Sequence, residues 1–220
     1  MDDDDYDDVE STSEDSRDTI PGCPRVAVFG GSFNPPHIAH VMAVVYALQV
    51  AEMDEVLIVP VFQHPFSKEL APFEDRLAMC EAAMGWIPGA RVSDVERELG
   101  GESLTLRMLT HLSREHPDWV LRLLVGADVL ADLPKWHRFD KIAEIAPPIV
   151  LGRAGLPADR AQVGAPYPGA PARTPEPLLP RISSTEVRDA IGRGDLEGIR
   201  PLLPARVLAY IEEHGLYRRS

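Results

Sequence analysis

Two histidines at the start of an expected helix are the residues most suited to chemistry. The segment 30–40 reads GGSFNPPHIAH, so His37 and His40 lie close together on the first helical turn. The glycine pair at 30–31 lets the backbone approach a ligand, and the proline pair at 35–36 suits a sharp entry to a helix. A helix N-terminus already attracts anions through its N–H groups and its dipole. Two imidazoles added there predict a phosphate pocket.

Two other interpretations of these histidines stay open. Histidines spaced in this way could hold a metal ion, although no third ligand is spaced nearby. Either side chain could also be an ordinary helix cap. The preference for a phosphate pocket rests on the whole segment 30–40, which is more specific than its parts.

A second segment, 182–188 (ISSTEVR), has the composition of an anion-binding helix start. Hydroxyls such as those of Ser183 and Ser184 cap helices, and the free N–H groups of the first turn accept an anion. Arg188 falls about one turn into this helix, where its guanidinium could reach the same anion. A plain helix cap followed by a solvent-facing arginine is the alternative.

Two further groups could contact a nucleotide. The sequence Gly126-Ala127-Asp128 follows an apolar run directly, and a carboxylate at that point can accept both hydroxyls of a ribose. Asp128 could equally be a helix cap. Trp136 offers an aromatic face, yet a lone tryptophan more often packs into a core than binds a ligand.

The elements that would position these residues alternate between strands and helices. Strands are expected, as continuous apolar runs, at 25–29, 55–61, 90–95, 119–125 and 148–151. Helices are expected at 38–51, at 73–86 with Leu77, Cys80, Ala83 and Met84 facing inward, and at about 104–115. This alternation predicts an α/β fold, a Rossmann-like, doubly wound parallel sheet with helices on both faces. Ligands bind beyond the carboxyl ends of such strands, where the candidate residues fall.

One domain is expected at residues 23–220, preceded by an acidic tail. The tail, residues 1–22, contains ten acidic side chains and one basic one, which accounts for −9 of the net charge of −13. It cannot bury enough apolar surface to fold, so we expect it to be disordered. Residues 153–180, rich in proline, predict a long surface loop. Two short helices are expected within 182–220, the last one ending at Gly215.

The composition argues against several classes of protein. The net charge of −13 has the wrong sign for non-specific nucleic-acid binding, and no basic stripe stands out. No apolar run approaches the length of a membrane span, and the acidic start lacks the apolar region of a secretory signal. Cys23 and Cys80 have no metal or redox spacing, which predicts free thiols and a cytoplasmic location.

The two candidate segments carry a family resemblance. The segment 30–40 resembles the G-x-F-x-P-x-H-x-x-H signature of the HxGH nucleotidyltransferase superfamily, with Ala39 where glycine is usual. The segment 182–188 resembles the I-S-S-T-x-x-R motif of the same superfamily, which holds the β- and γ-phosphates of ATP. Within that superfamily the chain is most similar, over residues 25–217, to the nicotinate (or nicotinamide) mononucleotide adenylyltransferases of NAD synthesis.

The resemblance implies roles for individual residues. His37, His40 and Arg188 would be catalytic and would act on the phosphates of ATP. Residues implied in ATP binding are Gly30, Gly31, Ser32, Phe33, Lys68, Gly126, Asp128, Ile182, Ser183 and Ser184. Residues implied in mononucleotide binding are Asn34, Thr105 and Trp136, the tryptophan by stacking on the pyridine ring. No side chain is expected to hold a metal ion directly.

The implied reaction transfers the adenylyl group of ATP to nicotinate or nicotinamide mononucleotide. Mg²⁺ would be bound mainly through the ATP phosphates, and pyrophosphate would leave. Residues 62–68 depart from the family's P-x-x-x-P-P-H-K pattern, and Leu104 stands where the family has an aromatic residue. Another adenylyl- or cytidylyltransferase of the superfamily, such as a pantetheine-phosphate enzyme, and a catalytically silent nucleotide-binding protein are therefore the alternatives. Neither the ring preference nor the oligomeric state follows from the sequence.

Overall fold

A computed structural model describes residues 22–63, 69–129, 136, 138–152 and 179–218. The acidic tail, Lys68 and nearly all of the expected loop at 153–180 lie outside these ranges, so the statements about them stay predictions. The side chain of Asp128 also lies outside the described part of the chain. Within that part, no helix is long and apolar enough to cross a lipid bilayer.

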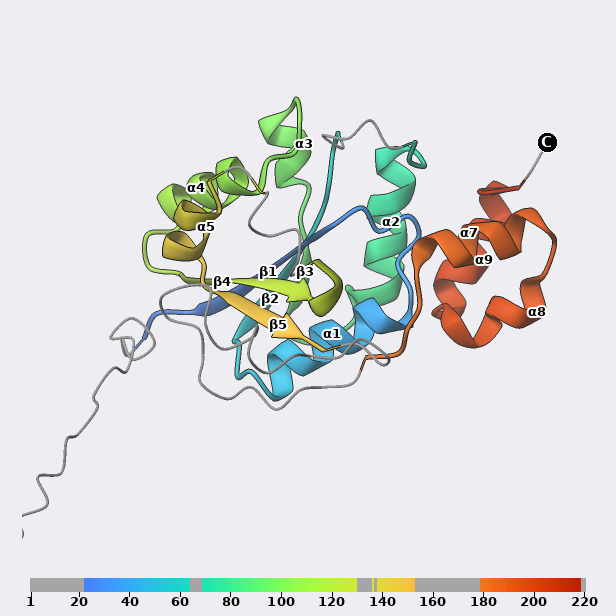
Figure 1. The fold of residues 1–220 in the computed structure, drawn as a ribbon, viewed down its shortest axis with the longest axis horizontal. Helices are drawn as coiled ribbons and strands as arrows, with labels where there is room; N and C mark the ends of the chain where they lie inside the picture. The colour runs from blue at the N-terminus through green and yellow to red at the C-terminus, as the bar shows by residue number, and fades with distance from the viewer. Residues whose placement is uncertain (1–21, 64–68, 130–135, 137, 153–178, 219–220) are drawn as a thin grey trace, which may run out of the picture.

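Five parallel strands form one sheet in the order β3-β2-β1-β4-β5 (Figure 1). The strands are β1 (Arg25–Gly31), β2 (Glu55–Pro60), β3 (Ala90–Val92), β4 (Val120–Gly126) and β5 (Pro148–Leu151). The sheet extends from β1 in both directions, which confirms the predicted doubly wound, Rossmann-like α/β fold. β3 is shorter than expected, because the chain forms a helix again soon after it.

Helices connect and cover the strands. They are α1 (Ile38–Gln49), α2 (Phe73–Met84), α3 (Val95–Leu99), α4 (Thr105–Glu115), α5 (Phe139–Ile145), α7 (Ser184–Gly192), α8 (Leu196–Ile199) and α9 (Ala205–His214), with short 3-10 helices η1 (Ala127–Val129) and η3 (Arg200–Leu202). The sequence did not predict α3, α5 or α8. Each is seven residues or shorter, too short for a helical period to stand out.

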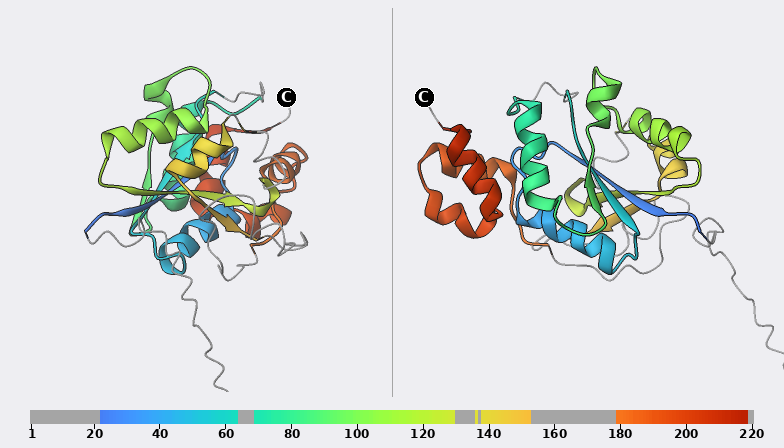
Figure 2. Two further views of the ribbon diagram at one scale, coloured as in Figure 1. Left: turned by 60° about the vertical axis from the view of Figure 1, so that its left-hand side comes forward. Right: turned by 180° about the vertical axis from the view of Figure 1, so that it is seen from behind.

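Two apolar layers lie on opposite faces of the sheet. Successive residues of β1 point to opposite faces, so Ala27 and Phe29 belong to one cluster and Val26 and Val28 to the other. The first cluster takes in buried residues of α1, α2 and α9, and the second takes in buried residues of α4 and α5. Figures 1 and 2 show α1 and α2 on one side of the sheet and α4 and α5 on the other, which confirms the prediction that both faces are covered.

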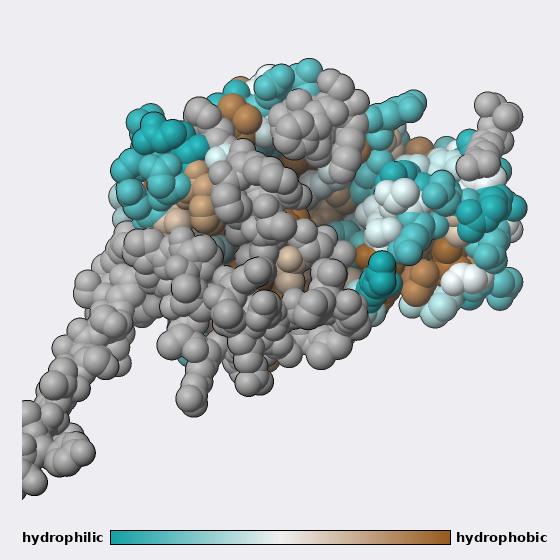
Figure 3. Space-filling view, in the orientation of Figure 1, coloured by the Kyte–Doolittle hydropathy of each residue, from teal (hydrophilic) through white to brown (hydrophobic). Residues whose placement is uncertain are grey.

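The C-terminal helices form a group beside α2, beyond the edge of the main layers (Figure 2). This segment has α8 and η3 between the two helices that the sequence predicted. The last helix, α9, ends at Gly215 with a φ of 63°, the left-handed geometry expected of a terminal glycine. Residues on the outer side of the group are mostly hydrophilic (Figure 3).

A buried arginine of α2 joins three segments of the chain. The side chain of Arg76 is fully buried, with 1% of its surface exposed. Its Nε donates to the carbonyl oxygen of Ala71 at 2.9 Å, and its Nη1 donates to the carbonyls of Ser32 at 3.1 Å and Val61 at 2.8 Å. These carbonyls belong to the turn after β1, the end of β2 and the entry to α2. Arg76 therefore sets the spacing of the two turns that leave the centre of the sheet.

The inward face of α2 differs from the prediction. Cys80, Ala83 and Met84 are buried as expected, but Leu77 is only half-buried. Arg76 and Met79 take the central positions instead. An apolar period cannot reveal Arg76 as an inward residue, because its burial depends on carbonyls that come from other segments.

Replacement of Arg76 tests its role in stability. Arg76→Met keeps most of the side-chain length but leaves three partly buried carbonyls without this donor, at about 1 kcal/mol or more each. The variant should lose roughly 3 kcal/mol or more of unfolding free energy, measured by urea denaturation. Arg97→Met is the matched control, because the Arg97 guanidinium also lies over the Phe73 ring but is exposed. Equal losses in the two variants would contradict the role given to Arg76.

Candidate active site

The turn after β1 lies at the point where the strand order reverses. β1 pairs with β2 on one side and with β4 on the other, so the carboxyl ends of β1 and β4 flank the same crevice. Phe33 has a φ of 44°, and a Cβ at Gly31 would lie 3.1 Å from its ring. A side chain at position 31 would therefore need the Phe33 ring to shift by a few tenths of an ångström. A Cβ at Gly30 would meet nothing within 4 Å, so Gly30 leaves exposed backbone that a ligand can approach.

The two histidines stack on each other at the start of α1. His37 is the N-cap residue, and the ring centroids of His37 and His40 lie 3.7 Å apart. The backbone N–H of His37 donates to Nδ1 of His40 at 3.0 Å. In a neutral ring that accepts at Nδ1, the proton lies on Nε2, so His40 has the tautomer that can donate from Nε2. The edges of Phe29 and Phe33 hold its ring in place.

The two histidines differ in how far solvent can reach their rings. His37 is 1% exposed, whereas His40 is half-buried. The sequence predicted that both rings face the phosphates. In this structure His40 is the ring that solvent, and therefore a ligand, can reach more readily, and His37 supports it from beneath.

The second candidate segment lies against the first. Arg188 on α7 donates from Nη1 to the carbonyl oxygen of Asn34 at 2.7 Å. The hydroxyl of Ser184 donates to the carbonyl oxygen of Pro35 at 2.9 Å. These bonds span 154 and 149 residues of sequence. The fold therefore brings the helix start at 184 to the histidine turn, with Ile182 buried as an apolar anchor beside it.

The serine hydroxyls of this segment already have partners in the protein. Ser183 caps α7, and both its Oγ and its backbone N–H donate to the carboxylate of Glu186, at 2.9 and 3.0 Å. These bonds from Ser183, together with the nearby positive groups of Arg181 and His37, lower the pKa of Glu186. An anion at this end of α7 would therefore be held by backbone N–H groups of the first turn and by Arg188.

Asn34 has a structural position in this structure. It is 3% exposed, and its Oδ1 accepts the backbone N–H of Ala71 at 3.1 Å and the hydroxyl of Tyr217 at 2.8 Å. The sequence predicted contact with the mononucleotide. That contact stays a prediction, and in this structure the oxygen of its side chain joins the turn after β1 to α2 and to the C-terminal segment.

The other implied ligand residues lie at two strand ends and around α4 and α5. Ser32 follows β1, and Gly126 ends β4 and is paired with Leu151. Thr105 is the half-buried first residue of α4. Trp136 is half-buried and packs against the apolar cluster under α4 and α5, so part of its ring serves the core.

A buried polar cluster that the sequence did not predict stands beside Thr105. The hydroxyl oxygen of Ser103 accepts the backbone N–H groups of Phe62 at 2.9 Å and Gln63 at 3.4 Å. Ser103 also hydrogen-bonds to Glu96, whose side chain is 3% exposed. Burial raises the pKa of Glu96, and the bond from Ser103 and the charge of Arg107 oppose this shift. The cluster fixes the start of segment 62–68 against the chain that leads into α4.

The raised pKa of Glu96 predicts a pH effect on stability. A carboxyl with a raised folded pKa favours its protonated form, so its contribution is present at low pH and is lost as pH rises. Glu96→Gln removes this titration. The unfolding free energy of the variant relative to the unchanged protein should therefore rise as pH increases above the ordinary glutamate pKa of about 4.3, measured by urea denaturation. Glu98→Gln, at an exposed position on the same helix, is the control. A difference for Glu96→Gln that is constant with pH would contradict the assignment.

The chain is similar over most of its length to proteins of one family. A family model described as cytidylyltransferase-like matches residues 28–190. A protein of Anaeromyxobacter sp. (strain K), named "Probable nicotinate-nucleotide adenylyltransferase", is 48% identical over 197 residues, which cover 88% of this chain and 97% of that protein. A protein of Myxococcus xanthus with the same name is 42% identical, with 88% and 94% covered.

Solved structures agree with the fold. Nicotinic acid mononucleotide adenylyltransferase of Plasmodium falciparum, complexed with NaAD, matches with a TM-score of 0.72 over 88% of this chain and 97% of that chain. At 20% identity this likeness shows the shared fold alone. The family model and the close relatives go further: the chain belongs to the cytidylyltransferase-like family and, within it, to the nicotinate-nucleotide adenylyltransferases.

Proposed function

We propose that this protein transfers the adenylyl group of ATP to nicotinate mononucleotide and releases pyrophosphate. The observation that carries the proposal is the contact between the histidine turn and the start of α7, made by Arg188 and Ser184 at the carboxyl edge of the sheet. Two anion-binding helix starts then face one region, as a triphosphate requires. The names of the close relatives favour nicotinate over nicotinamide as the ring of the acceptor.

The chemistry is an in-line displacement at the α-phosphorus. A phosphate oxygen of the mononucleotide forms the new bond, the bond to the bridging α–β oxygen breaks, and pyrophosphate takes the electron pair. No side chain becomes covalently attached, so the protein acts by positioning and by stabilising charge. His40 donates from Nε2 to the phosphoryl oxygens while His37 braces its ring. Arg188 and the first turn of α7 hold the leaving pyrophosphate.

Nucleotidyltransferases of this family generally use a divalent metal ion. Among the described residues, no group of three or more His, Cys, Asp or Glu side chains could hold one. The side chains near the phosphate pocket are two imidazoles, an arginine and one carboxylate, that of Glu186, which already accepts hydrogen bonds from Ser183. Mg²⁺ prefers several oxygen ligands. We therefore propose Mg²⁺ bound mainly through ATP, where it neutralises phosphate charge.

The remaining assignments are proposals of the same kind. Gly30, Gly126 and Asp128 would contact the adenosine half of ATP, and Lys68 would contact its triphosphate. Thr105 and Trp136 would line the pyridine site, with the exposed part of Trp136 available for stacking. We propose a single domain at 23–220 behind an acidic tail, and a cytoplasmic location.

The choice of acceptor is tested by pyrophosphate release with ATP and Mg²⁺. Nicotinate mononucleotide should support turnover, with nicotinamide mononucleotide slower and phosphopantetheine inactive. Turnover with phosphopantetheine alone would assign the protein to another member of the superfamily. ATP binding without release for any acceptor would indicate a silent nucleotide-binding protein.

Replacement of His40 tests the mechanism. Loss of one donor to a charge that develops in the transition state lowers kcat by about 10²- to 10³-fold or more, so His40→Ala should fall at least that far. The fold should survive, because the ring is half-buried at a helix start. His111→Ala, on α4, is the control and should keep normal turnover. Near-normal kcat for His40→Ala would rule out the mechanism as written.

A further inference from the structure

We propose that Tyr217 is a positioning residue for this reaction, because its hydroxyl holds the histidine turn in place through Asn34. This inference rests on the proposed function. It extends the site to the chain that follows α7. None of the proposed phosphate-binding groups lies on that part of the chain. Tyr217 would act on the rate of the chemical step without touching either substrate.

The contacts of Asn34 connect Tyr217 to Arg188. The hydroxyl of Tyr217 donates to Oδ1 of Asn34 at 2.8 Å. Nη1 of Arg188 donates to the backbone oxygen of the same asparagine at 2.7 Å. The next carbonyl along the chain, that of Pro35, accepts the hydroxyl of Ser184. One buried residue therefore receives the C-terminal segment on its side chain and α7 on its main chain, three residues before His37.

The environment keeps the Tyr217 hydroxyl a donor. Burial raises its pKa well above the ordinary value, while the positive charges of Arg188 and Arg76 oppose that shift. The phenol is therefore protonated throughout the neutral range. Asn34 Oδ1 can only accept, so the direction of the bond is fixed.

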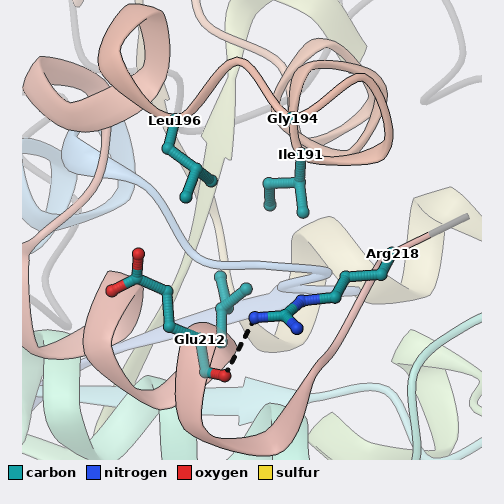
Figure 4. A pocket seen from close by; sticks show the side chains of 6 residues that line it. Ile191, Gly194, Leu196, Glu212 and Arg218 are labelled. Atoms are coloured by element: carbon teal, nitrogen blue, oxygen red, sulfur yellow. Dashed lines mark hydrogen bonds between the residues drawn. The ribbon is translucent and has the colours of Figure 1, made fainter.

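The chain around Tyr217 is arranged to present this hydroxyl. Tyr217 has a φ of 62°, a left-handed conformation that costs about 1 kcal/mol for a residue with a side chain. Just before it, the N–H of Leu216 donates to the carbonyl of Ile211 at 3.1 Å. Just after it, the guanidinium of Arg218 folds back over α9 and donates to the carbonyl of Glu212 at 3.3 Å (Figure 4). Tyr217 is thus held from both sides.

The pocket beside Arg218 does not bear on this role. It has a volume of about 180 Å³ and is lined by Ile191, Leu196 and Ile211 as well as by Arg218 (Figure 4). Its lining belongs to the C-terminal helices and does not include Tyr217 or Asn34.

A second tyrosine supplies the control. The hydroxyl of Tyr210, on α9, donates to Oδ1 of Asp75 on α2 at 2.9 Å. It joins the same C-terminal segment to the body of the protein, but it ends on α2 and not on the histidine turn. Tyr210→Phe and Tyr217→Phe each remove one hydroxyl and one hydrogen bond. Only Tyr217→Phe removes a hydrogen bond from Asn34. In that variant Oδ1 of Asn34 accepts only the backbone N–H of Ala71.

The test compares kcat, both KM values and urea denaturation for the two variants. Tyr217→Phe should lower kcat by about 10- to 100-fold, because small displacements of positioned groups act on the transition state. Its KM values should change less than threefold, and Tyr210→Phe should keep kcat within twofold. The stability losses of the two variants should be similar. A kcat for Tyr217→Phe within twofold of normal, or equal losses of kcat in both variants, would overturn the proposal.

A readout that needs no turnover separates this proposal from the proposed function. Amide hydrogen exchange of a peptide covering residues 31–37 should quicken in Tyr217→Phe and stay unchanged in Tyr210→Phe. If the unchanged protein is inactive with every acceptor, the proposed reaction fails, and this exchange still decides whether Tyr217 holds the histidine turn. Unaltered exchange in Tyr217→Phe would then overturn that role.

Discussion

The buried guanidinium of Arg76 is the constraint on which the candidate site depends. It donates to partly buried carbonyls from the turn after β1, the end of β2 and the entry to α2. Parallel strands end at one edge of the sheet, but nothing in the strand pairing fixes the turns that follow. A planar group with several donors can fix two turns at once, because each donor points in a set direction.

The turn held in this way is joined to the rest of the site by main-chain carbonyls. Asn34 and Pro35 offer successive backbone oxygens to Arg188 and Ser184. Contacts of this kind position α7 without depending on long, mobile side chains. The motif alone would assign the Ser184 hydroxyl to ATP. In this structure that hydroxyl donates to the carbonyl oxygen of Pro35. A helix start bound in this way still has its backbone N–H groups and its dipole for an anion.

Near Thr105, at the carboxyl edge of the sheet, a second polar group, Ser103, fixes the chain. The hydroxyl oxygen of Ser103 accepts the backbone N–H groups of Phe62 and Gln63. The same hydroxyl donates to the buried carboxyl of Glu96. The segment that departs most from the family pattern is therefore attached at its base to the chain that leads into Thr105.

The sequence by itself determined where the strands fall along the chain, the parallel sheet, and the starts of the helices that follow the segments 30–37 and 182–183. Continuous apolar runs and the segments 30–40 and 182–188 are local features, legible without partners. Only the tertiary structure decided which histidine is buried, that Asn34 serves the turn, and that Arg76, Glu96 and Tyr217 belong near the site. These side chains owe their positions to partners distant in sequence, and periodicity carries no information about such partners.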